Sequence, residues 1–240
     1  MLALRSLAFN VAFYAWTFVM VLGSAWTLVL PPRHLIAAQR RWALGVNRLL
    51  RHVAGIEIEI RGRPPAGACI VAAKHQSAWD TLIWHVELDA PAIVMKQELL
   101  AIPIYGRMCR RSGMIAIDRN GGARALKAML EQAKAAVGHG RAVVVFPQGT
   151  RTPPGLPVEA TPYQPGVAAL YRTLHVPCVP VALNSGLFWP RRAFLRKPGR
   201  IVLEYLAPIP PGLDRKAFEA ELIARIEGAT ARLEAEGRKA

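Results

Sequence analysis

The chain has 240 residues, 52% of them hydrophobic, and 31 Lys and Arg residues against 16 Asp and Glu residues give a formal net charge of +15. This length suits one sizeable domain with an appendage. The charge favours nucleic acid, an anionic membrane surface or phosphorylated substrates as partners, and the apolar content favours the membrane over a soluble nucleic-acid binder. The scattered Cys69, Cys109 and Cys178 lack metal-ligand spacing, which indicates reduced packing residues in a cytosol-facing protein.

The first 30 residues are apolar. No charged side chain occurs in residues 6–32, and residues 7–30 are long enough to cross a hydrocarbon core. We expect a membrane segment with aromatic residues as interfacial anchors. A cleaved signal peptide with its site at residues 23–25 is the rival interpretation. A hairpin of two helices that enters one leaflet and returns is the alternative to a full span.

Arginines follow this segment much more often than they precede it. Only Arg5 comes before it, whereas five follow: Arg33, Arg40, Arg41, Arg48 and Arg51. The positive-inside rule therefore predicts that the rest of the chain lies in the cytoplasm, at the inner membrane. Residues 34–53 have apolar positions at helical spacing and predict an amphipathic helix. Its arginines would meet anionic head groups, or else the helix packs on its own domain.

Short apolar runs alternate with helical patterns along the rest of the chain. Strands are expected at residues 56–61, 68–73, 92–95, 114–117, 142–146, 179–183 and 201–205, and helices at residues 81–86, 98–109, 123–137, 167–174 and 214–237. This order predicts a single α/β domain with a mostly parallel or mixed central sheet flanked by helices. We therefore divide the chain into an N-terminal membrane segment with a basic amphipathic helix, residues 1–54, and an α/β domain, residues 55–240.

A histidine and a carboxylate five residues apart follow the second expected strand. On one continuous α-helix, His75 and Asp80 would point about 140° apart and could not share a hydrogen bond. Ser77 followed by Asp80 has the Ser-x-x-Asp pattern of a helix start, which puts His75 on the preceding turn. A carboxylate that folds back to the ring would make His75 a general base. Alternatively, Asp80 only caps the helix and His75 is a polar loop residue.

Polar residues also follow two other expected strands. Asp118 and Arg119 come after residues 114–117, and the run Pro147-Gln148-Gly149-Thr150-Arg151 comes after residues 142–146. Open α/β sheets build their sites at the carboxyl ends of strands, so these residues should converge near His75. Gly149 allows close backbone approach, Thr150 offers donors, and Arg151 can grip a phosphate with two hydrogen bonds. Two strand-end arginines predict a doubly charged phosphate monoester as ligand.

These motifs, in this order, resemble the glycerolipid acyltransferases, and are most similar to the bacterial 1-acyl-glycerol-3-phosphate acyltransferases. The resemblance spans about residues 70–183 and rests on His75-x4-Asp80, residues 113–119, residues 145–151 and residues 176–181. Residues 96–99 and 163–166 are also similar to segments of that family. One position departs from the pattern, because the family usually has Glu where this chain has Gln148.

The resemblance implies transfer of a fatty acyl group from a thioester to the free sn-2 hydroxyl of a lysophosphatidate. His75 would act as the base and Asp80 would orient it. Arg119 and Arg151 would bind the acceptor phosphate, with Gln148, Gly149 and Thr150 lining that site. Lys96 and backbone N–H groups at the helix start would stabilise the oxyanion. No metal or bound cofactor is expected, because acyl-CoA or acyl carrier protein brings the acyl group as a substrate.

Several alternatives follow from the same residues. A serine hydrolase through Ser77 lacks a Gly-x-Ser-x-Gly elbow. The acceptor could instead be a lyso-ornithine lipid or another lysolipid, for which Gln148 is the only hint. A membrane-tethered basic adaptor that binds anionic lipid would explain the charge but not the spaced motifs. Membrane lipids, a lysophospholipid and acyl carrier protein are the expected partners, and nucleic acid is not.

Overall fold

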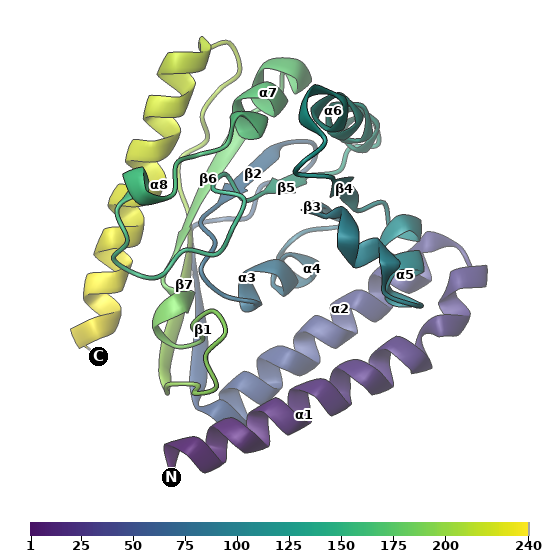
Figure 1. The fold of residues 1–240 in the computed structure, drawn as a ribbon, viewed down its shortest axis with the longest axis vertical. Coiled ribbons are helices and arrows are strands. Elements are labelled where there is room, and N and C mark those ends of the chain that lie inside the picture. Colours follow the sequence, from purple (N-terminus) through teal and green to yellow (C-terminus); the bar gives the residue numbers. More distant parts are fainter. Residues whose placement is uncertain (240) are drawn as a thin grey trace.

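A seven-stranded mixed sheet lies at the centre of the computed structural model, which describes residues 1–239, and helices cover both of its faces (Figure 1). The strands are β1 (Ile56–Arg61), β2 (Ile70–Ala73), β3 (Ala92–Lys96), β4 (Ile115–Ile117), β5 (Val143–Val145), β6 (Cys178–Leu183) and β7 (Gly199–Tyr205). Their order is β1-β7-β6-β2-β5-β3-β4. Strands β2 to β6 are mutually parallel, whereas β7 pairs antiparallel with β6 and parallel with β1. The expected α/β class with a mixed sheet is confirmed.

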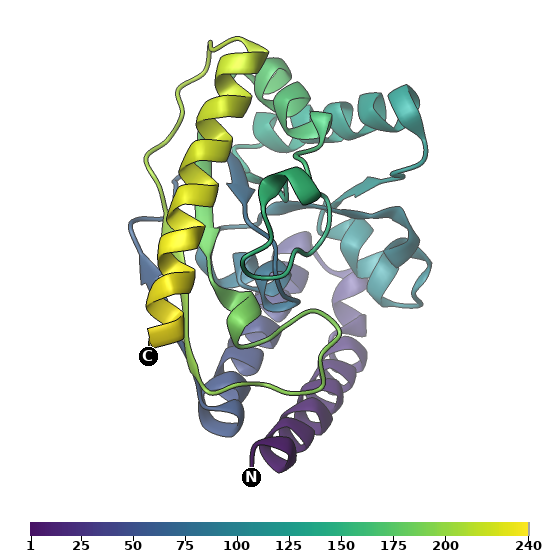
Figure 2. The ribbon, with the colours of Figure 1, turned by 60° about the vertical axis from the view of Figure 1, so that its left-hand side comes forward.

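The main helices form two layers around this sheet. They are α1 (Leu2–Gly23), α2 (Pro32–Leu49), α3 (Trp79–Leu82), α4 (Trp84–Glu87), α5 (Tyr105–Arg111), α6 (Gly122–Gly138), α7 (Pro165–Leu174) and α8 (Arg215–Lys239). Helices α6, α7 and α8 bury their apolar faces on one side, and α2, α3 and α4 bury theirs on the other. Figure 2 shows α8 extending along one side of the molecule, where it packs on β6.

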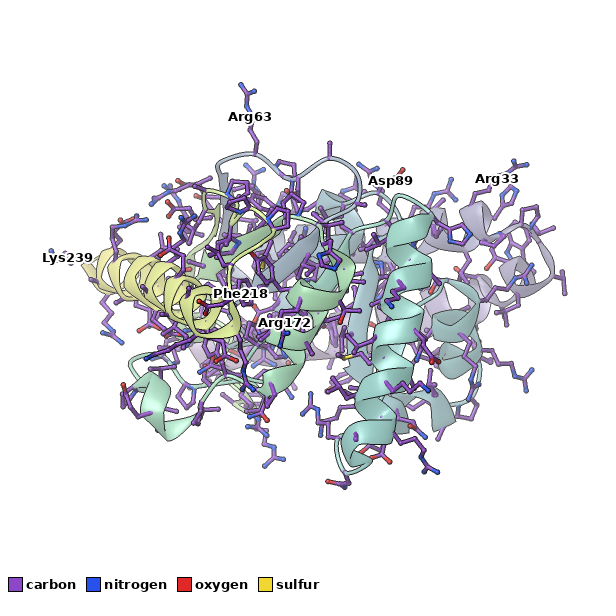
Figure 3. All side chains as sticks on the ribbon, turned by 90° about the horizontal axis from the view of Figure 1, so that it is seen from above. Arg33, Arg63, Asp89, Arg172, Phe218 and Lys239 are labelled. Carbon is purple, nitrogen blue, oxygen red and sulfur yellow. The ribbon has the colours of Figure 1, made fainter. Side chains whose placement is uncertain are left out.

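Side chains alternate between the two faces of each buried strand, and this alternation supplies the apolar core under both helix layers. In β2, Ile70 and Ala72 belong to the core under α6, α7 and α8, whereas Val71 and Ala73 belong to the core under α2, α3 and α4. Successive side chains of a strand point to opposite faces, so a strand covered on both sides must be apolar throughout. All four residues are fully buried. On the first side, the Phe218 ring of α8 (Figure 3) stacks on Tyr171 of α7.

The apolar N-terminal segment is a helix followed by a turn. Helix α1 ends at Gly23, a 3₁₀ turn covers Ala25–Val29, and α2 then runs back alongside α1 (Figure 1). The indole N–H of Trp16 donates to the carbonyl of Trp42 at 3.0 Å, and the indole N–H of Trp42 donates to the hydroxyl of Thr17 at 3.1 Å. By length and composition alone, Leu2–Val29 is long and apolar enough to cross a membrane. Within the predicted membrane segment, residues 7–30, the α-helix ends at Gly23 and the 3₁₀ turn forms most of the remainder.

The amphipathic helix expected at residues 34–53 is confirmed. Helix α2 continues as a single π-helical turn, Leu50–Ala54, which ends at Gly55 in the left-handed conformation, φ 70°. Val46 and Leu50 are fully buried in the same core as β2. All five arginines that follow the apolar segment are exposed: Arg33, Arg40, Arg41, Arg48 and Arg51. The helix therefore packs on the domain and still presents its basic face to the surroundings.

Two expected helices are interrupted. The helix expected at residues 98–109 consists of a 3₁₀ turn, Gln97–Ala101, and then α5, because Pro103 lacks an N–H and holds the residue before it in an extended conformation. The helix expected to start after Ser77 and to run through residues 81–86 consists of two short helices, α3 and α4. Both interruptions lie beside the carboxyl ends of strands, where the chain turns toward the site.

Candidate active site

His75 and Asp80 form a hydrogen-bonded pair where β2 gives way to α3. The Nδ1 atom of His75 lies 3.0 Å from Oδ2 of Asp80. The His75 side chain is 13% exposed, whereas that of Asp80 is fully buried. Because Nδ1 is bonded to the carboxylate, Nε2 is the ring nitrogen left for a substrate. The predicted geometry, with the histidine on a turn and the carboxylate folded back from the first helical turn, is confirmed.

Asp80 is held by a dense set of donors. Its Oδ2 atom also accepts hydrogen bonds from the backbone N–H groups of Gln76 at 2.6 Å and Ser77 at 2.8 Å. Its Oδ1 atom accepts from the hydroxyls of Ser77 at 3.2 Å and Ser185 at 2.6 Å. The hydroxyl oxygen of Ser77 accepts from the N–H of Trp79, the first residue of α3, at 3.0 Å. Asp80 therefore binds the N–H groups of the turn before the helix and orients the His75 ring at the same time.

The His75 ring is fixed by the loop that follows β5. Strands β2 and β5 are neighbours in the sheet, so the residues after them meet. The Phe146 ring stacks on the imidazole with ring centroids 4.1 Å apart and 24° between their planes. The Thr152 N–H donates to the His75 carbonyl at 2.8 Å. Packing and hydrogen bonds thus restrict both the backbone and the ring of His75.

A cavity of about 460 Å³ lies next to this pair, and its lining differs from one part to another. Residues of α1 and α2 supply mainly apolar side chains, among them Met20, Val21, Leu35 and Trp42. The residues that line the cavity also include five cationic side chains and the Thr150 hydroxyl: Lys96, Arg119, Arg151, Arg191 and Arg192 with Thr150. An apolar region beside a cluster of cations suits a ligand that has both a hydrocarbon chain and an anionic group.

The arginines in this cavity are partly removed from water. Burial lowers the pKa of the Arg151 guanidinium, the positive charges of Arg191 and Arg192 lower it further, and the Asp80 carboxylate raises it. Burial likewise lowers the pKa of Arg119, which Glu98 partly offsets. These pKa directions mean that the charged guanidinium groups are destabilised as they stand. A bound anion would relieve that destabilisation.

Of the residues predicted to line the site after β5, three line the cavity and Gln148 does not. Gly149 has φ 67°, a conformation that glycine adopts without strain, and it lines the cavity together with Thr150 and Arg151. The side chain of Gln148 is buried behind the loop instead. Its Nε2 donates to the Thr161 carbonyl at 3.0 Å, and its Oε1 accepts from the Thr152 hydroxyl at 3.4 Å. Gln148 therefore does not line the cavity with its neighbours, and its amide braces the loop.

The structure also adds residues that local sequence patterns do not reveal. Ser185 reaches Asp80 from 105 positions away. Lys74 and Gln76 flank His75, and each bonds to a carboxylate of α8. Lys74 Nζ lies 2.7 Å from Glu227 Oε2, and Gln76 Nε2 donates to Glu234 Oε1 at 2.7 Å. The two glutamates are seven residues apart on a helix, a spacing that puts them on one face, but nothing nearby in the sequence points to their partners.

A family model described as "Acyltransferase" matches residues 55–184. A 1-acyl-sn-glycerol-3-phosphate acyltransferase of Pseudomonas aeruginosa is 34% identical over 164 residues, which are 68% of this chain and 63% of the relative. The alpha form of Mus musculus is 30% identical over 165 residues, 66% of this chain and 57% of the relative. The crystal structure of the acyltransferase PlsC from Thermotoga maritima superposes with a TM-score of 0.75 at 23% identity, covering 98% of this chain and 97% of that one.

The fold and the paired His and Asp beside a basic cavity thus define an α/β protein of the acyltransferase class. By the family model and the Pseudomonas relative, this chain belongs to the acyltransferase family. The alignments cover about six-tenths of the length of the Pseudomonas and mouse relatives. Within residues 1–239, no three His, Cys, Asp or Glu side chains are grouped as a metal site would need.

Proposed function

We propose that this protein transfers a fatty acyl group from an acyl thioester to the sn-2 hydroxyl of 1-acyl-glycerol-3-phosphate, which gives phosphatidate. The observation that carries the proposal is the His75 and Asp80 pair, 3.0 Å apart, in a cavity that is apolar in one part and lined by arginines in another. The relatives in Pseudomonas and mouse are named for this activity.

In the proposed reaction, His75 Nε2 takes the proton of the acceptor hydroxyl while the oxygen attacks the thioester carbonyl. The buried Asp80 carboxylate, bonded to Nδ1, stabilises the imidazolium as it forms. When the tetrahedral intermediate collapses, the C–S bond breaks and the imidazolium returns its proton to the departing thiolate. The thiolate is a good leaving group, so direct transfer needs no acyl-enzyme.

The developing oxyanion needs a donor near His75. The helix-start N–H groups of Gln76 and Ser77, which the sequence offered for this role, are bonded to Asp80. The Lys96 ammonium lines the same cavity as His75 and is free of any ion pair among residues 1–239. We therefore assign the oxyanion to Lys96. Arg151 and Arg119 supply positive charge to the cavity for the phosphate groups of the substrates, and Gly149 and Thr150 belong to the same lining.

The α1 and α2 hairpin, within the proposed membrane segment of residues 1–54, would hold the protein at the membrane. Exposed apolar side chains of α1 include Leu7, Val11, Phe18 and Leu22. A full span of α1 would carry the exposed Arg40 and Arg41 of the adjacent α2 toward the bilayer centre, which costs about 2.5–3.5 kcal/mol for each charge. A shallow hairpin in one leaflet avoids this cost. It also keeps both helices and the α/β domain on the cytoplasmic side of the inner membrane.

His75→Ala tests the proposal. Washed membranes that contain the variant should lose acyl transfer to lysophosphatidate, whereas the variant should stay in the membrane fraction. His139→Ala is the matched control, because His139 is exposed at the end of α6, away from the cavity. Equal activity of wild type and His75→Ala would contradict the proposal.

The donor and the acceptor are identified by one assay matrix with the purified protein. Acyl-CoA and acyl carrier protein are supplied as donors against lysophosphatidate, lyso-ornithine lipid and other lysolipids as acceptors. Highest turnover with lysophosphatidate is expected, because the arginine-lined part of the cavity suits a phosphate monoester. Preference for a lysolipid without phosphate would contradict the assignment of the acceptor.

A further inference from the structure

A loop beyond the family-model match brings two more arginines into the cavity. This loop, residues 188–198, connects the 3₁₀ turn Ser185–Leu187 to β7, and the family model ends at residue 184. Arg191 and Arg192 of this loop line the same cavity as His75 and Arg151. Arg192 has φ 58°, a left-handed conformation that long side chains rarely adopt. Because the backbone turns at Arg192, the consecutive side chains of Arg191 and Arg192 both line the cavity.

Arg191 lies directly against the loop that holds Arg151. Its Nη1 atom donates to the Thr150 hydroxyl and to the Arg151 carbonyl, both at 3.3 Å. Among residues 1–239, neither Arg151 nor Arg191 is paired with a carboxylate. Two neighbouring guanidinium groups without a counter-ion repel each other, so their placement is stabilised when an anion binds between them.

The basic lining of the cavity has two separate origins. Arg151 and Arg191 come from the loops after β5 and β6, whereas Lys96 and Arg119 come from the ends of β3 and β4, on the other side of β5 in the sheet. The charges that act on Arg151 are those of Arg191, Arg192 and Asp80, whereas the charge that acts on Arg119 is that of Glu98. Arg191 is therefore the partner of Arg151 at an anion subsite.

The same loop is fastened to the apolar helix α1. The Arg196 N–H donates to the Ser6 hydroxyl at 2.9 Å, and its guanidinium donates to Asn10 Oδ1 at 2.9 Å. The Trp189 ring meets the Phe9 ring edge to face, with centroids 5.2 Å apart. Ser6 and Asn10, polar residues in an otherwise apolar helix, thus hold the loop against α1. The subsite is consequently tied to the helix that we place in the membrane.

We propose that Arg191 and Arg151 together bind the phosphate monoester of the lysolipid acceptor. The proposal rests on the proposed function and specifies which substrate this subsite takes. A phosphate dianion matches two guanidinium groups, each of which can donate two hydrogen bonds. Attachment to α1 favours the membrane-resident acceptor over the phosphate of the donor, which arrives from water.

Arg191→Gln, in the full-length protein in detergent micelles, tests this assignment. We expect the KM for lysophosphatidate to rise about 10-fold, which corresponds to about 1.4 kcal/mol, with kcat and the KM for the acyl donor within about twofold. With 1-monoacylglycerol, an acceptor without phosphate, variant and wild type should react at the same rate. Arg63→Gln is the control, because it removes the same charge from an exposed side chain that points away from the molecule (Figure 3).

A binding measurement separates this proposal from the proposed function. sn-Glycerol 3-phosphate should raise the Tm of the wild type and of Arg63→Gln, and it should raise that of Arg191→Gln much less, whether or not the preparation is active. Equal behaviour of Arg191→Gln and Arg63→Gln in both experiments would overturn the assignment. A rise confined to the KM for the acyl donor would also overturn it, because the subsite would then belong to the donor phosphate. If the wild type acylated no lysolipid, the proposed function alone would fail.

Discussion

The Asp80→Asn variant isolates the charge of the buried carboxylate, because Asn has nearly the same shape. The Oδ2 position faces the His75 ring and the N–H groups of Gln76 and Ser77, so the Asn carbonyl oxygen must occupy it. The new amide group then faces the hydroxyls of Ser77 and Ser185, which can accept hydrogen bonds instead of donating them. We therefore expect the variant to fold with a Tm close to that of the wild type.

The expected loss of rate follows from the separation of the two charges. His75 becomes positively charged as it takes the acceptor proton, at 3.0 Å from the carboxylate. Coulomb's law gives about 5 kcal/mol for full charges at this distance and an effective dielectric constant of about 20. The Asn oxygen retains a hydrogen bond, and the imidazolium is only partly formed in the transition state. A loss of about 2–3 kcal/mol should therefore lower kcat about 30- to 160-fold.

The assay is initial-rate acyl transfer to lysophosphatidate at saturating donor and acceptor. Asp89→Asn serves as the control, because it makes the same chemical change outside the cavity. Asp89 is exposed on the loop after α4 (Figure 3). KM for both substrates should stay near the wild-type value, since Asp80 is buried and does not line the cavity. A folded Asp80→Asn protein with more than half of the wild-type kcat would refute the role of this charge.

Three further predictions concern the surroundings of the pair. Ser185→Ala removes a buried donor to the Asp80 carboxylate, and it should lower the free energy of unfolding by about 1.5–3 kcal/mol in urea titrations; an unchanged midpoint would contradict this. Glu227→Ala leaves Lys74, which is 3% exposed, without its carboxylate, and it should cost about 3–5 kcal/mol. The double variant Lys74→Met, Glu227→Leu should recover most of that loss, and failure to do so would argue against the buried charge as its cause. Burial lowers the pKa of His85 to about 4, below its unfolded value of about 6.5. The unfolded state therefore binds more protons between these values, and stability falls as the pH falls from about 6.5 to 4. Urea titrations over this range should show a steeper decline for wild type than for His85→Gln, and parallel declines would refute the assignment.

Local sequence patterns predicted the ends of helices and strands well where a few neighbouring residues determine the backbone conformation. The alternation of Ile56–Arg61 marked β1 with its observed ends, and Ser77 followed by Asp80 marked the turn from which α3 starts. The pattern failed at Pro103, where helical periodicity continues but the helix cannot. Hydrophobicity reports burial or membrane contact, whereas this break depends on the backbone of proline.

The sequence by itself predicted that His75 and Asp80 can pair only across a turn, because residues five apart on one helix point away from each other, and the structure showed the hydrogen bond. It also determined that residues after strands carry the polar groups of the site, since parallel strands end at one edge of a sheet. Only the tertiary structure decided that Ser185, Arg191 and the glutamates of α8 surround the same turn, and that Gln148 faces away from it. The hydrogen bonds of Ser185, Arg191 and the α8 glutamates span 40 to 158 positions of the chain, and contacts over such separations are set by the packing of strands and helices rather than by any local pattern.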